Sequence, residues 1–483
     1  MAMLRPGSRD SIVVGAGPNG LAAAITMARA GKSVLVVEAA DRPGGCVRSE
    51  EGSLPGFIHD TYASVFSMAV GTPFFDSLPP QAFPVEWVVP PAALAHPFDD
   101  GTCLLLSRSV EDSAEAMGPD GAAYLELMKP FAKRWSALAW DILQPLVHVP
   151  RHPGLLLSFG LRGIQPVARS ARRLFQTDKA RSLFAGLGAH AVLPQESLGT
   201  TAFALFMGAS AHATGWPIPR GGAQRVTDAL TAYLQSLYAE IELRREVHDF
   251  RGLPYSRLIF LDLTPRQILW ITRDRLPRRH RLQLERYGYG PGVCKVDWAL
   301  EGPIPWKARR CREALTVHLG GTYEEIALSE RQIRHGIHPA RPFVICVQPS
   351  LFDASRAPRD RHTAWAYCHV PSESRQDMSR IIEQQVERFA PGFGRLILSR
   401  RVLTAEGLHA RNPNLVGGDM TGGANTFFQL LFRPDVSLKP YAFGRSRFRV
   451  CSASSPPGGG VHGMCGYNAA TRALAEIWKI RGR

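Results

Sequence analysis

The stretch that decides the fold is Ser11–Glu38, which reads SIVVGAGPNGLAAAITMARAGKSVLVVE. It contains, in order, an apolar strand, a glycine-rich turn, a helix of small residues, a second apolar strand and an acid: Ser11–Val14, Gly15–Gly20, Leu21–Ala30, Lys32–Val37 and Glu38. The turn fits the pattern G-x-G-x-x-G. A glycine turn between a strand and a helix, with an acid at the end of the next strand, is typical of dinucleotide binding. This order therefore predicts a Rossmann-like unit.

Each glycine of the turn has a physical reason. The first permits the tight turn, the second lets the backbone approach a pyrophosphate, and the third allows the helix to pack closely on the sheet. The helix N-terminus offers N–H groups and a positive dipole to phosphates. The sequence predicts that the whole turn contacts the cofactor: Gly15, Ala16, Gly17, Pro18, Asn19 and Gly20. Glu38 is expected to accept hydrogen bonds from a ribose, with Ala39 beside it.

The residues after Glu38 indicate which dinucleotide binds. Arg42-Pro43-Gly44-Gly45 fits R-x-G-G, and Arg48 follows it. This extension resembles the FAD-binding opening of the glutathione-reductase-like flavoproteins, whereas NAD-binding units usually lack it. The double glycine lets the chain pass close to the cofactor, and the two arginines supply positive charge near its phosphates. We therefore expect FAD, with Arg42, Gly44 and Gly45 among its contacts.

The C-terminal end carries a second glycine-rich signal. A strand is predicted over Phe448–Ser454, and it leads into a loop that contains Gly458-Gly459-Gly460. A helix is predicted to follow, as far as about Ile480. Bare backbone N–H groups ahead of a helix are suited to hold an acceptor group.

Length and composition place the chain among large globular proteins. It has 483 residues, 45% hydrophobic and 20% charged, so two domains or one large composite fold are expected. Eight cysteines occur without a C-x-x-C pair, which argues against a redox disulfide and a zinc–thiolate site, and no metal site is predicted. The leader Met1–Asp10 has no apolar core, so no signal peptide and a cytoplasmic location are expected.

The charge balance is basic, with 57 Lys and Arg against 42 Asp and Glu. One arginine cluster lies between Arg162 and Arg181, and another between Arg266 and Arg286. Neither is interleaved with stacking aromatic residues or set in a known module, so no nucleic-acid partner is predicted. The apolar run Leu155–Leu161 precedes the first cluster, which suggests peripheral contact with an anionic membrane. The favoured alternative is a solvated helix face.

The uncharged stretch Ser197–Pro219 is long enough for a membrane span. Its glycines, prolines, hydroxyl side chains and His212 argue instead for a buried helix that lines a cavity, followed by a turn at Gly215-Trp216-Pro217. No membrane span is predicted.

The expected organisation is discontinuous: an α/β protein with a Rossmann-like FAD-binding domain and a mixed α+β substrate domain. The FAD-binding domain is assigned residues 1–88, 216–264 and 401–483, and the substrate domain residues 89–215 and 265–400. Residues 89–215 are expected to be mostly helical. Further strands are predicted at Ile241–Val247, Leu258–Leu263, Lys295–Leu300, Thr316–Leu319, Phe343–Gln348 and Thr363–Val370, with helices at Ala223–Leu237 and Met378–Phe389.

Nearly the whole chain resembles the phytoene desaturase-like FAD-dependent oxidoreductases. The closest resemblance is to their non-carotenoid relatives of the pyridine nucleotide-disulfide oxidoreductase domain-containing type. Besides the two terminal motifs, the carriers are Pro219–Gly222, Tyr289–Val293 with Lys295–Asp297, Gly417–Asp419 and Gln429–Pro434. The paired redox cysteines of disulfide reductases are absent from the sequence.

The resemblance implies a two-domain flavoprotein with FAD extended in the first domain and its ring facing a substrate cavity. Carried over by position, the glycine turn holds the pyrophosphate and Glu38 the ribose. Arg42 and Gly45 fall along the phosphate–ribityl part, and Val247 near the adenine. Gly459, Val461 and His462 fall beside the flavin ring. The stretch Arg251–Leu258 is shorter than in longer members of the family, so the adenine side departs from the pattern.

No second G-x-G-x-x-G stands in a strand–helix–strand context, so no built-in NAD(P)H domain is visible. The expected activity is dehydrogenation or desaturation of an apolar substrate, with electrons passed to oxygen, a quinone or an external carrier. His462 is the candidate proton acceptor; the alternative is that it only packs or hydrogen-bonds the backbone. Two other functions stay open: a flavin amine or amino-acid oxidase, and a non-catalytic lipid-binding protein of the GDP-dissociation-inhibitor type. The sequence does not identify the substrate or the oligomeric state.

Overall fold

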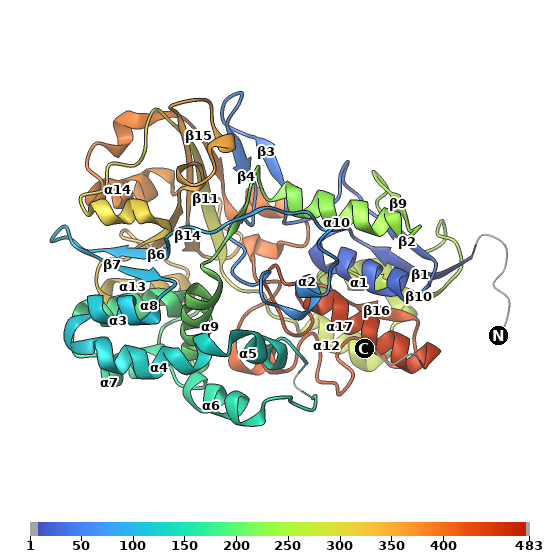
Figure 1. Cartoon of the computed structure of the whole chain (residues 1–483). Coiled ribbons are helices and arrows are strands. Elements are labelled where there is room, and N and C mark those ends of the chain that lie inside the picture. Colours follow the sequence, from blue (N-terminus) through green and yellow to red (C-terminus); the bar gives the residue numbers. More distant parts are fainter. Residues whose placement is uncertain (1–7, 146, 480–483) are drawn as a thin grey trace.

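The computed structural model of the chain describes residues 8–145 and 147–479 and contains two large sheets (Figure 1). The first is parallel throughout and has the order β16-β10-β1-β2-β9. Its strands are β16 (Phe448–Val450), β10 (Ser256–Leu261), β1 (Arg9–Val14), β2 (Val34–Val37) and β9 (Glu240–Glu242). Strands from separate parts of the chain build this sheet. The predicted α/β class with a discontinuous Rossmann-like unit is confirmed.

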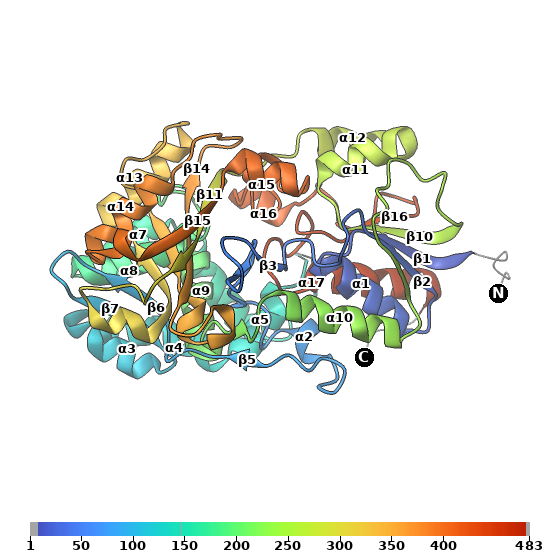
Figure 2. The ribbon, with the colours of Figure 1, turned by 90° about the horizontal axis from the view of Figure 1, so that it is seen from above.

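Helices cover both faces of the parallel sheet, because its strands are apolar on both sides. One face packs on α1 (Pro18–Arg29), α10 (Gln224–Ser236) and α17 (Met464–Ala473) through residues such as Val13 and Val36. The other face packs on α11 (Pro265–Thr272) and α12 (Arg278–Glu285). Figure 2 shows α11 and α12 on one side of the sheet and α10 on the other.

The second sheet is mixed and has the order β15-β11-β14-β13-β12-β6-β7. Neighbouring strands are antiparallel except β6 and β12, which are parallel. The strands are β15 (Ile397–Leu403), β11 (Gly292–Leu300), β14 (His362–Val370), β13 (Val344–Val347), β12 (Ala314–Leu319), β6 (Ala92–Pro97) and β7 (Cys103–Ser107). One face packs on α14 (Ser379–Phe389), and the other faces α13 (Tyr323–Arg334) and the cavity described below.

A helical layer completes this half of the molecule: α3 (Val110–Ala116), α4 (Gly121–Lys133), α5 (Trp135–Ile142), α6 (Pro153–Gly163), α7 (Val167–Leu174), α8 (Asp178–Ala189) and α9 (Thr200–Thr214). Shorter elements are the hairpin β3 (Ser49–Glu51) and β4 (Ile58–Asp60), the pair β5 (Trp87–Val88) and β8 (Ile218–Pro219), and α2 (Pro73–Asp76), α15 (Ala405–Arg411) and α16 (Phe427–Leu431).

The uncharged stretch Ser197–Pro219 forms α9 and a turn. α9 is almost entirely buried, and Gly215, at φ +78°, ends it in the left-handed conformation. Among the residues that the structure describes, no helix is long and apolar enough to cross a membrane. The prediction of a buried helix followed by a turn is confirmed.

Residues 89–215 are mostly helical, as predicted, and they also contribute β6 and β7 to the second sheet. Three other expectations about secondary structure need correction. The predicted strand Phe448–Ser454 ends earlier, at Val450 in β16. The predicted strand Ile241–Val247 is reduced to β9, since Arg244, at φ +55°, adopts a left-handed conformation that interrupts it. The α-helix expected to reach Ile480 ends at Ala473 and continues as a π-helical turn, Leu474–Trp478; Ile480 itself lies outside the described residues. The domain boundaries stay predictions, and β15 crosses the one at residue 400.

Candidate dinucleotide site and substrate cavity

The turn between β1 and α1 is a tight backbone cradle. Gly15 has φ +100°, and its N–H donates to the carbonyl of Val37 at 2.8 Å. A Cβ at Gly20 would lie 2.1 Å from the carbonyl oxygen of Gly15, and one at Gly17 would lie 2.5 Å from a carboxylate oxygen of Asp262. These positions exclude any side chain, as predicted for a phosphate-binding turn.

The last α-helix, α17, packs against the same turn. A Cβ at Gly466 in α17 would lie 1.8 Å from the carbonyl oxygen of Asn19, so only glycine allows α17 to pack against the start of α1. The C-terminal glycine-rich segment is thereby brought to the N-terminal turn.

Glu38 is fixed at the end of β2 by the loops around it. Its Oε2 accepts a hydrogen bond from the N–H of Ala16 at 2.7 Å, and its Oε1 accepts one from the N–H of Ala40 at 2.9 Å. These bonds hold the carboxylate at the cavity edge, where the sequence predicts a ribose.

A second carboxylate, which sequence reasoning missed, lies against the turn. Asp262 follows β10, and its Oδ2 accepts the N–H of Gly20 at 2.9 Å. Burial and the nearby charge of Glu38 raise the pKa of Asp262 to about 7. The available signal was its position at the carboxyl end of a parallel strand, where ligands of open α/β sheets bind.

One cavity of about 890 Å³ runs from this cradle to the second sheet. Most predicted cofactor-binding residues line it: Gly15, Gly17, Pro18, Asn19, Glu38, Ala39, Gly45, Val247, Gly459, Val461 and His462. Four lie outside its lining: Ala16, Gly20, Arg42 and Gly44. Ala16 and Gly20 instead donate hydrogen bonds to Glu38 and Asp262.

The arginine that reaches the cavity is Arg48. It lines the cavity, while its Nη2 donates to the carbonyl of Arg42 and to Asp41, at 3.0 and 3.1 Å. Arg42 is part-exposed, and its guanidinium lies 3.7 Å from Glu50. Gly44, at φ +134°, shapes the turn by donating its N–H to Ala16. Arg48 is thus better placed than Arg42 for a cofactor phosphate.

His462 is fully buried at the entrance to α17. Its Nδ1 accepts the N–H of Met464 at 3.0 Å, so the proton of the neutral ring is on Nε2, which has no hydrogen-bond partner among the described residues. Burial lowers the pKa of His462 to about 4. This geometry suits a neutral hydrogen-bond donor and does not favour proton acceptance, so the catalytic assignment remains a hypothesis.

The far part of the cavity is mainly apolar. α9 contributes Ala202, Phe203, Phe206 and Met207, and the second sheet contributes Ile345, Val347, Trp365 and Tyr367. The rings of Trp365 and Tyr367 are stacked, with centroids 6.0 Å apart. The predicted role of α9 as a cavity wall is confirmed.

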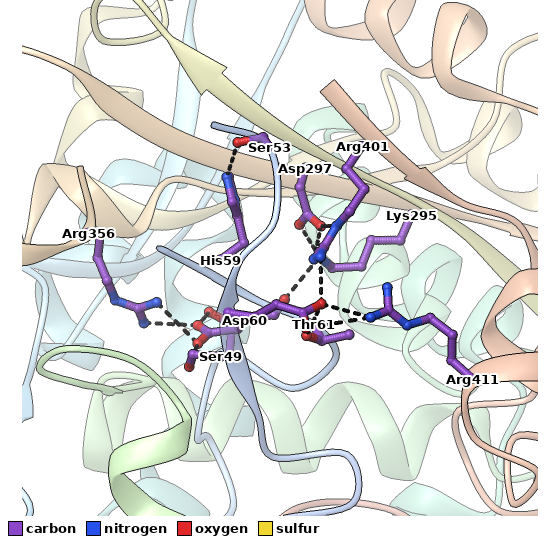
Figure 3. Close-up of polar contacts among 12 residues, drawn as sticks. Ser49, Ser53, His59, Asp60, Thr61, Lys295, Asp297, Arg356, Arg401 and Arg411 are labelled. Carbon is purple, nitrogen blue, oxygen red and sulfur yellow. Dashed lines mark hydrogen bonds and ion pairs between the residues drawn. The ribbon is translucent and has the colours of Figure 1, made fainter. Parts of the chain in front are cut away.

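Lys295, on β11, is a charged residue in this wall whose location sequence reasoning missed. Its ammonium group donates to the carbonyl of Asp60 at 3.0 Å and pairs with Asp297 (Figure 3). It also lies 5.1 Å from the ring centroid of Trp365. Burial lowers the pKa of Lys295, although the charge of Asp297 opposes this shift. A lysine and an aspartate in an otherwise apolar strand were the available signal.

Figure 3 also shows a buried ion pair that joins the hairpin β3–β4 to the substrate side. Arg356 donates to both carboxylate oxygens of Asp60, at 3.1 and 2.9 Å, and to Asp353 at 3.0 Å. The carboxylates in turn accept the N–H groups of Ala223 and Gly221. Burial opposes ionisation of Asp60, but Arg356 outweighs it and holds the pKa of Asp60 below its usual value. The Arg220-Gly221-Gly222 motif is positioned by this pair.

Comparison with known proteins agrees with this arrangement. Residues 13–78 match the family described as "NAD(P)-binding Rossmann-like domain". The chain is 23% identical to pyridine nucleotide-disulfide oxidoreductase domain-containing protein 2 of Rattus norvegicus, over 97% of this chain and 94% of that protein. It is 40% identical over 110 residues to hydroxyneurosporene desaturase of Rhodobacter capsulatus, which is 22% of each chain.

A solved structure of a putrescine oxidase double mutant has the same fold. Its TM-score is 0.61 at 13% identity, and the match covers 98% of this chain and 99% of that one. This match shows the shared fold, and the sequence relatives confirm the resemblance predicted from the terminal motifs: the chain is similar to pyridine nucleotide-disulfide oxidoreductase domain-containing protein 2 over nearly its whole length and to hydroxyneurosporene desaturase over a shorter stretch.

Proposed function

We propose that the chain is a FAD-dependent oxidoreductase that removes hydride from an apolar organic substrate, as a dehydrogenase or desaturase. The observation that carries this proposal is the continuity of the cavity. It joins a dinucleotide cradle at β1–α1 to an apolar chamber lined by α9 and the second sheet. A cofactor and an apolar substrate can therefore meet inside one cavity.

The residues of the cradle fit FAD. The glycine turn leaves no room for side chains, Glu38 presents a fixed carboxylate, and Arg48 supplies positive charge. The glycines before His462 line the cavity and are available to a polar ring edge. When bound, FAD supplies a ring that accepts hydride from a C–H bond. Oxygen, a quinone and an external carrier remain the three classes of electron acceptor.

The chain's own residues would then act by positioning. The glycine turn and the N-terminus of α1 bind the diphosphate, and Glu38 orients the ribose. The apolar walls from α9 exclude water from the reacting carbon. Purified protein should show a flavin spectrum and release free FAD on denaturation, and anaerobic addition of isoprenoid substrates should bleach it. A colourless protein after expression with ample flavin contradicts the proposal.

The substitution Glu38→Ala is expected to weaken FAD binding by roughly 10- to 100-fold, because hydrogen bonds to a charged group contribute about 1.5–3 kcal/mol each. Turnover per bound flavin should stay near the wild-type value, since Glu38 is assigned to the ribose. Titration of apoprotein with FAD measures the first quantity, and initial rates normalised to bound flavin measure the second. Glu51→Ala, on the exposed end of β3, is the matched control. Normal FAD binding combined with lost turnover would show that Glu38 is catalytic.

A flavin amine oxidase is the second candidate, and a specific observation favours it. Lys295 and the stacked pair Trp365 and Tyr367 lie in the cavity wall, and a lysine with an aromatic cage suits an amine substrate. Anaerobic reduction by long-chain amines but not by isoprenoids would select this alternative. The intact glycine turn argues against a non-catalytic lipid-binding protein.

We also propose that α6 contacts an anionic membrane. Leu157 and Leu161 on this helix are 63% and 65% exposed, while Phe159 of the same helix lines the cavity. Exposed arginines extend from the end of α6 along α7: Arg162, Arg169, Arg172 and Arg173. An apolar face bordered by positive charge is typical of helices that lie in the membrane interface, and here it would give an apolar substrate a short route to the cavity.

Binding to vesicles that contain phosphatidylglycerol is therefore expected, with salt weakening it and Arg172→Glu/Arg173→Glu reducing it at least several-fold, about 1 kcal/mol per charge. Vesicles of phosphatidylcholine alone should bind weakly. Co-sedimentation measures both. The control is the double reversal Arg278→Glu/Arg286→Glu on the exposed side of α12. Equal binding to both vesicle types would leave α6 and α7 as solvated helices.

A further inference from the structure

A pair of histidines links the cavity wall to the buried interior of the second sheet. His190 directly follows α8 and lines the cavity, and its Nε2 lies 3.1 Å from Nε2 of His318 on β12. His318 is fully buried. Burial lowers the pKa of His190 to about 3 and that of His318 well below its usual value. Both rings are therefore neutral near pH 7, and each carries one proton.

The proton on His318 is placed by what surrounds its other nitrogen. Nδ1 of His318 is buried without a hydrogen-bond partner among the described residues, and it faces α8 so closely that a Cβ at Gly186 would lie 2.8 Å from it. The nearby ring of His96 does not accept a hydrogen bond from this nitrogen, because its Nδ1 is also without a partner among the described residues. The Nε2 of His96 lies 2.9 Å from the carbonyl oxygen of Gly321. An orphaned buried N–H is rare in folded proteins, so the proton of His318 lies on Nε2 and is donated to His190.

The tautomer of His190 follows from this. Its Nε2 accepts the hydrogen bond from His318, so its single proton lies on Nδ1. His190 is half-buried and lines the cavity. Its Nδ1–H is therefore the donor that this ring can offer to a ligand in the cavity.

Two further donors on the same wall are unsatisfied. The indole N–H of Trp365 and the hydroxyl of Thr316 are buried, line the cavity and have no partner within residues 8–145 and 147–479. They lie in one cross-strand row, because Thr316 pairs with Val347 and Val347 pairs with Trp365. Both groups are enclosed, so neither reaches a ligand directly, but they make this part of the wall more polar than the rest of the chamber.

We propose that His190, set as the Nδ1–H tautomer by His318, donates a hydrogen bond to an uncharged oxygen of the substrate. The substrate class is then an apolar molecule that carries a carbonyl, ether or hydroxyl oxygen, rather than a plain hydrocarbon. This inference deepens the proposed function and rests on it, because it assigns the second sheet's wall to the substrate. His190 acts as a specificity residue and His318 as a positioning residue.

The tautomer is tested on the FAD-loaded full chain labelled with ¹⁵N-histidine. Long-range ¹H–¹⁵N spectra, with His190 assigned by the loss of its signals in His190→Gln, should show a protonated Nδ1 and a bare Nε2. The pattern should not change between pH 6 and 8. In His318→Phe, His190 loses its donor and should become a mixture of both tautomers. A protonated Nε2 on wild-type His190, or titration within this range, overturns the proposal.

The substrate side is tested with the probe pair 2-undecanone and undecane, by displacement of Nile red from the holoenzyme. The ratio of their dissociation constants should shift against the ketone by about three- to tenfold in His190→Phe, because the carbonyl then lacks its donor. Met207→Leu, a change of similar volume in the same cavity, should leave the ratio unaltered. An unchanged ratio in His190→Phe, an equal shift in Met207→Leu, or no displacement by the ketone would each contradict the proposal. Failure of the proposed function would instead appear as the absence of a flavin spectrum.

Discussion

Replacing Arg356 by Met is expected to lower the free energy of unfolding by about 3–5 kcal/mol, the usual cost of breaking a buried ion pair. Arg356 is fully buried and is the shared partner of Asp60 and Asp353. Without it, the carboxylate of Asp60 loses its ion-pair partner, and that of Asp353 keeps only the half-exposed Arg220, at 3.9 Å. Because they also hold the start of α10 through Gly221 and Ala223, flavin retention should fall as well. Urea denaturation followed by tryptophan fluorescence measures the change.

Two further variants test whether the loss of stability comes from stranded charge in the interior. Arg359→Met removes an arginine whose side chain is 96% exposed and should cost less than about 1 kcal/mol. Asp60→Asn combined with Arg356→Met removes one stranded charge and should recover part of the stability lost in the single variant, because the two sites are directly coupled. A single variant as stable as wild type would mean that the Arg356 contacts contribute nothing net. A double variant that is no more stable than Arg356→Met would exclude stranded charge as the cause.

The features that the sequence predicts well are those set by neighbours along the chain. The glycine turn, α1 and β2 need only a local pattern, and so does the buried helix α9 between two glycines. β6 and β7 were missed because Ala92–Pro97 has no β-branched residue. It becomes a strand through pairing with β12, which lies more than 200 residues further along the chain. Such tertiary pairing overrides local propensity.

The site was predictable where the cofactor meets the first strand and helix, and less so elsewhere. Asp262, Lys295 and His190 reach the cavity from separate strands and helices, and a single sequence does not show which of them meet. Arg48 lines the cavity and Arg42 does not, because of the way the chain turns at Gly44 and Gly45, both at positive φ. A motif places a glycine reliably because backbone shape is local, whereas a long side chain has several directions open to it.

Asp262→Asn is expected to stabilise the protein at pH 8 by about 2–4 kcal/mol relative to wild type and to slow the loss of flavin. The raised pKa of about 7 means that folding favours the protonated carboxyl. The wild type therefore loses stability as pH rises from the unfolded value near 3.8 through 7, and the loss is complete above that window. A cavity-lining position moderates the size of the effect, because water in the cavity screens the charge. Asparagine keeps an oxygen acceptor for the N–H of Gly20 and adds no charge beside the diphosphate.

The effect of the Asp262 charge is isolated by comparing wild type and Asp262→Asn at several pH values. Melting temperatures of wild type and Asp262→Asn should converge toward pH 4 and diverge up to pH 8, and the half-time of flavin release should follow the same trend. Asp249→Asn is the control, since Asp249 caps an exposed turn through the N–H of Arg251 and lies away from the glycine cradle. If the two proteins differ by the same amount at every pH, the carboxyl is not the titrating group. If Asp262→Asn releases flavin faster at pH 8, the negative charge of Asp262 is required for flavin binding. The contact of this carboxylate with Gly20 would then order the turn for the cofactor, and its charge would not oppose the diphosphate.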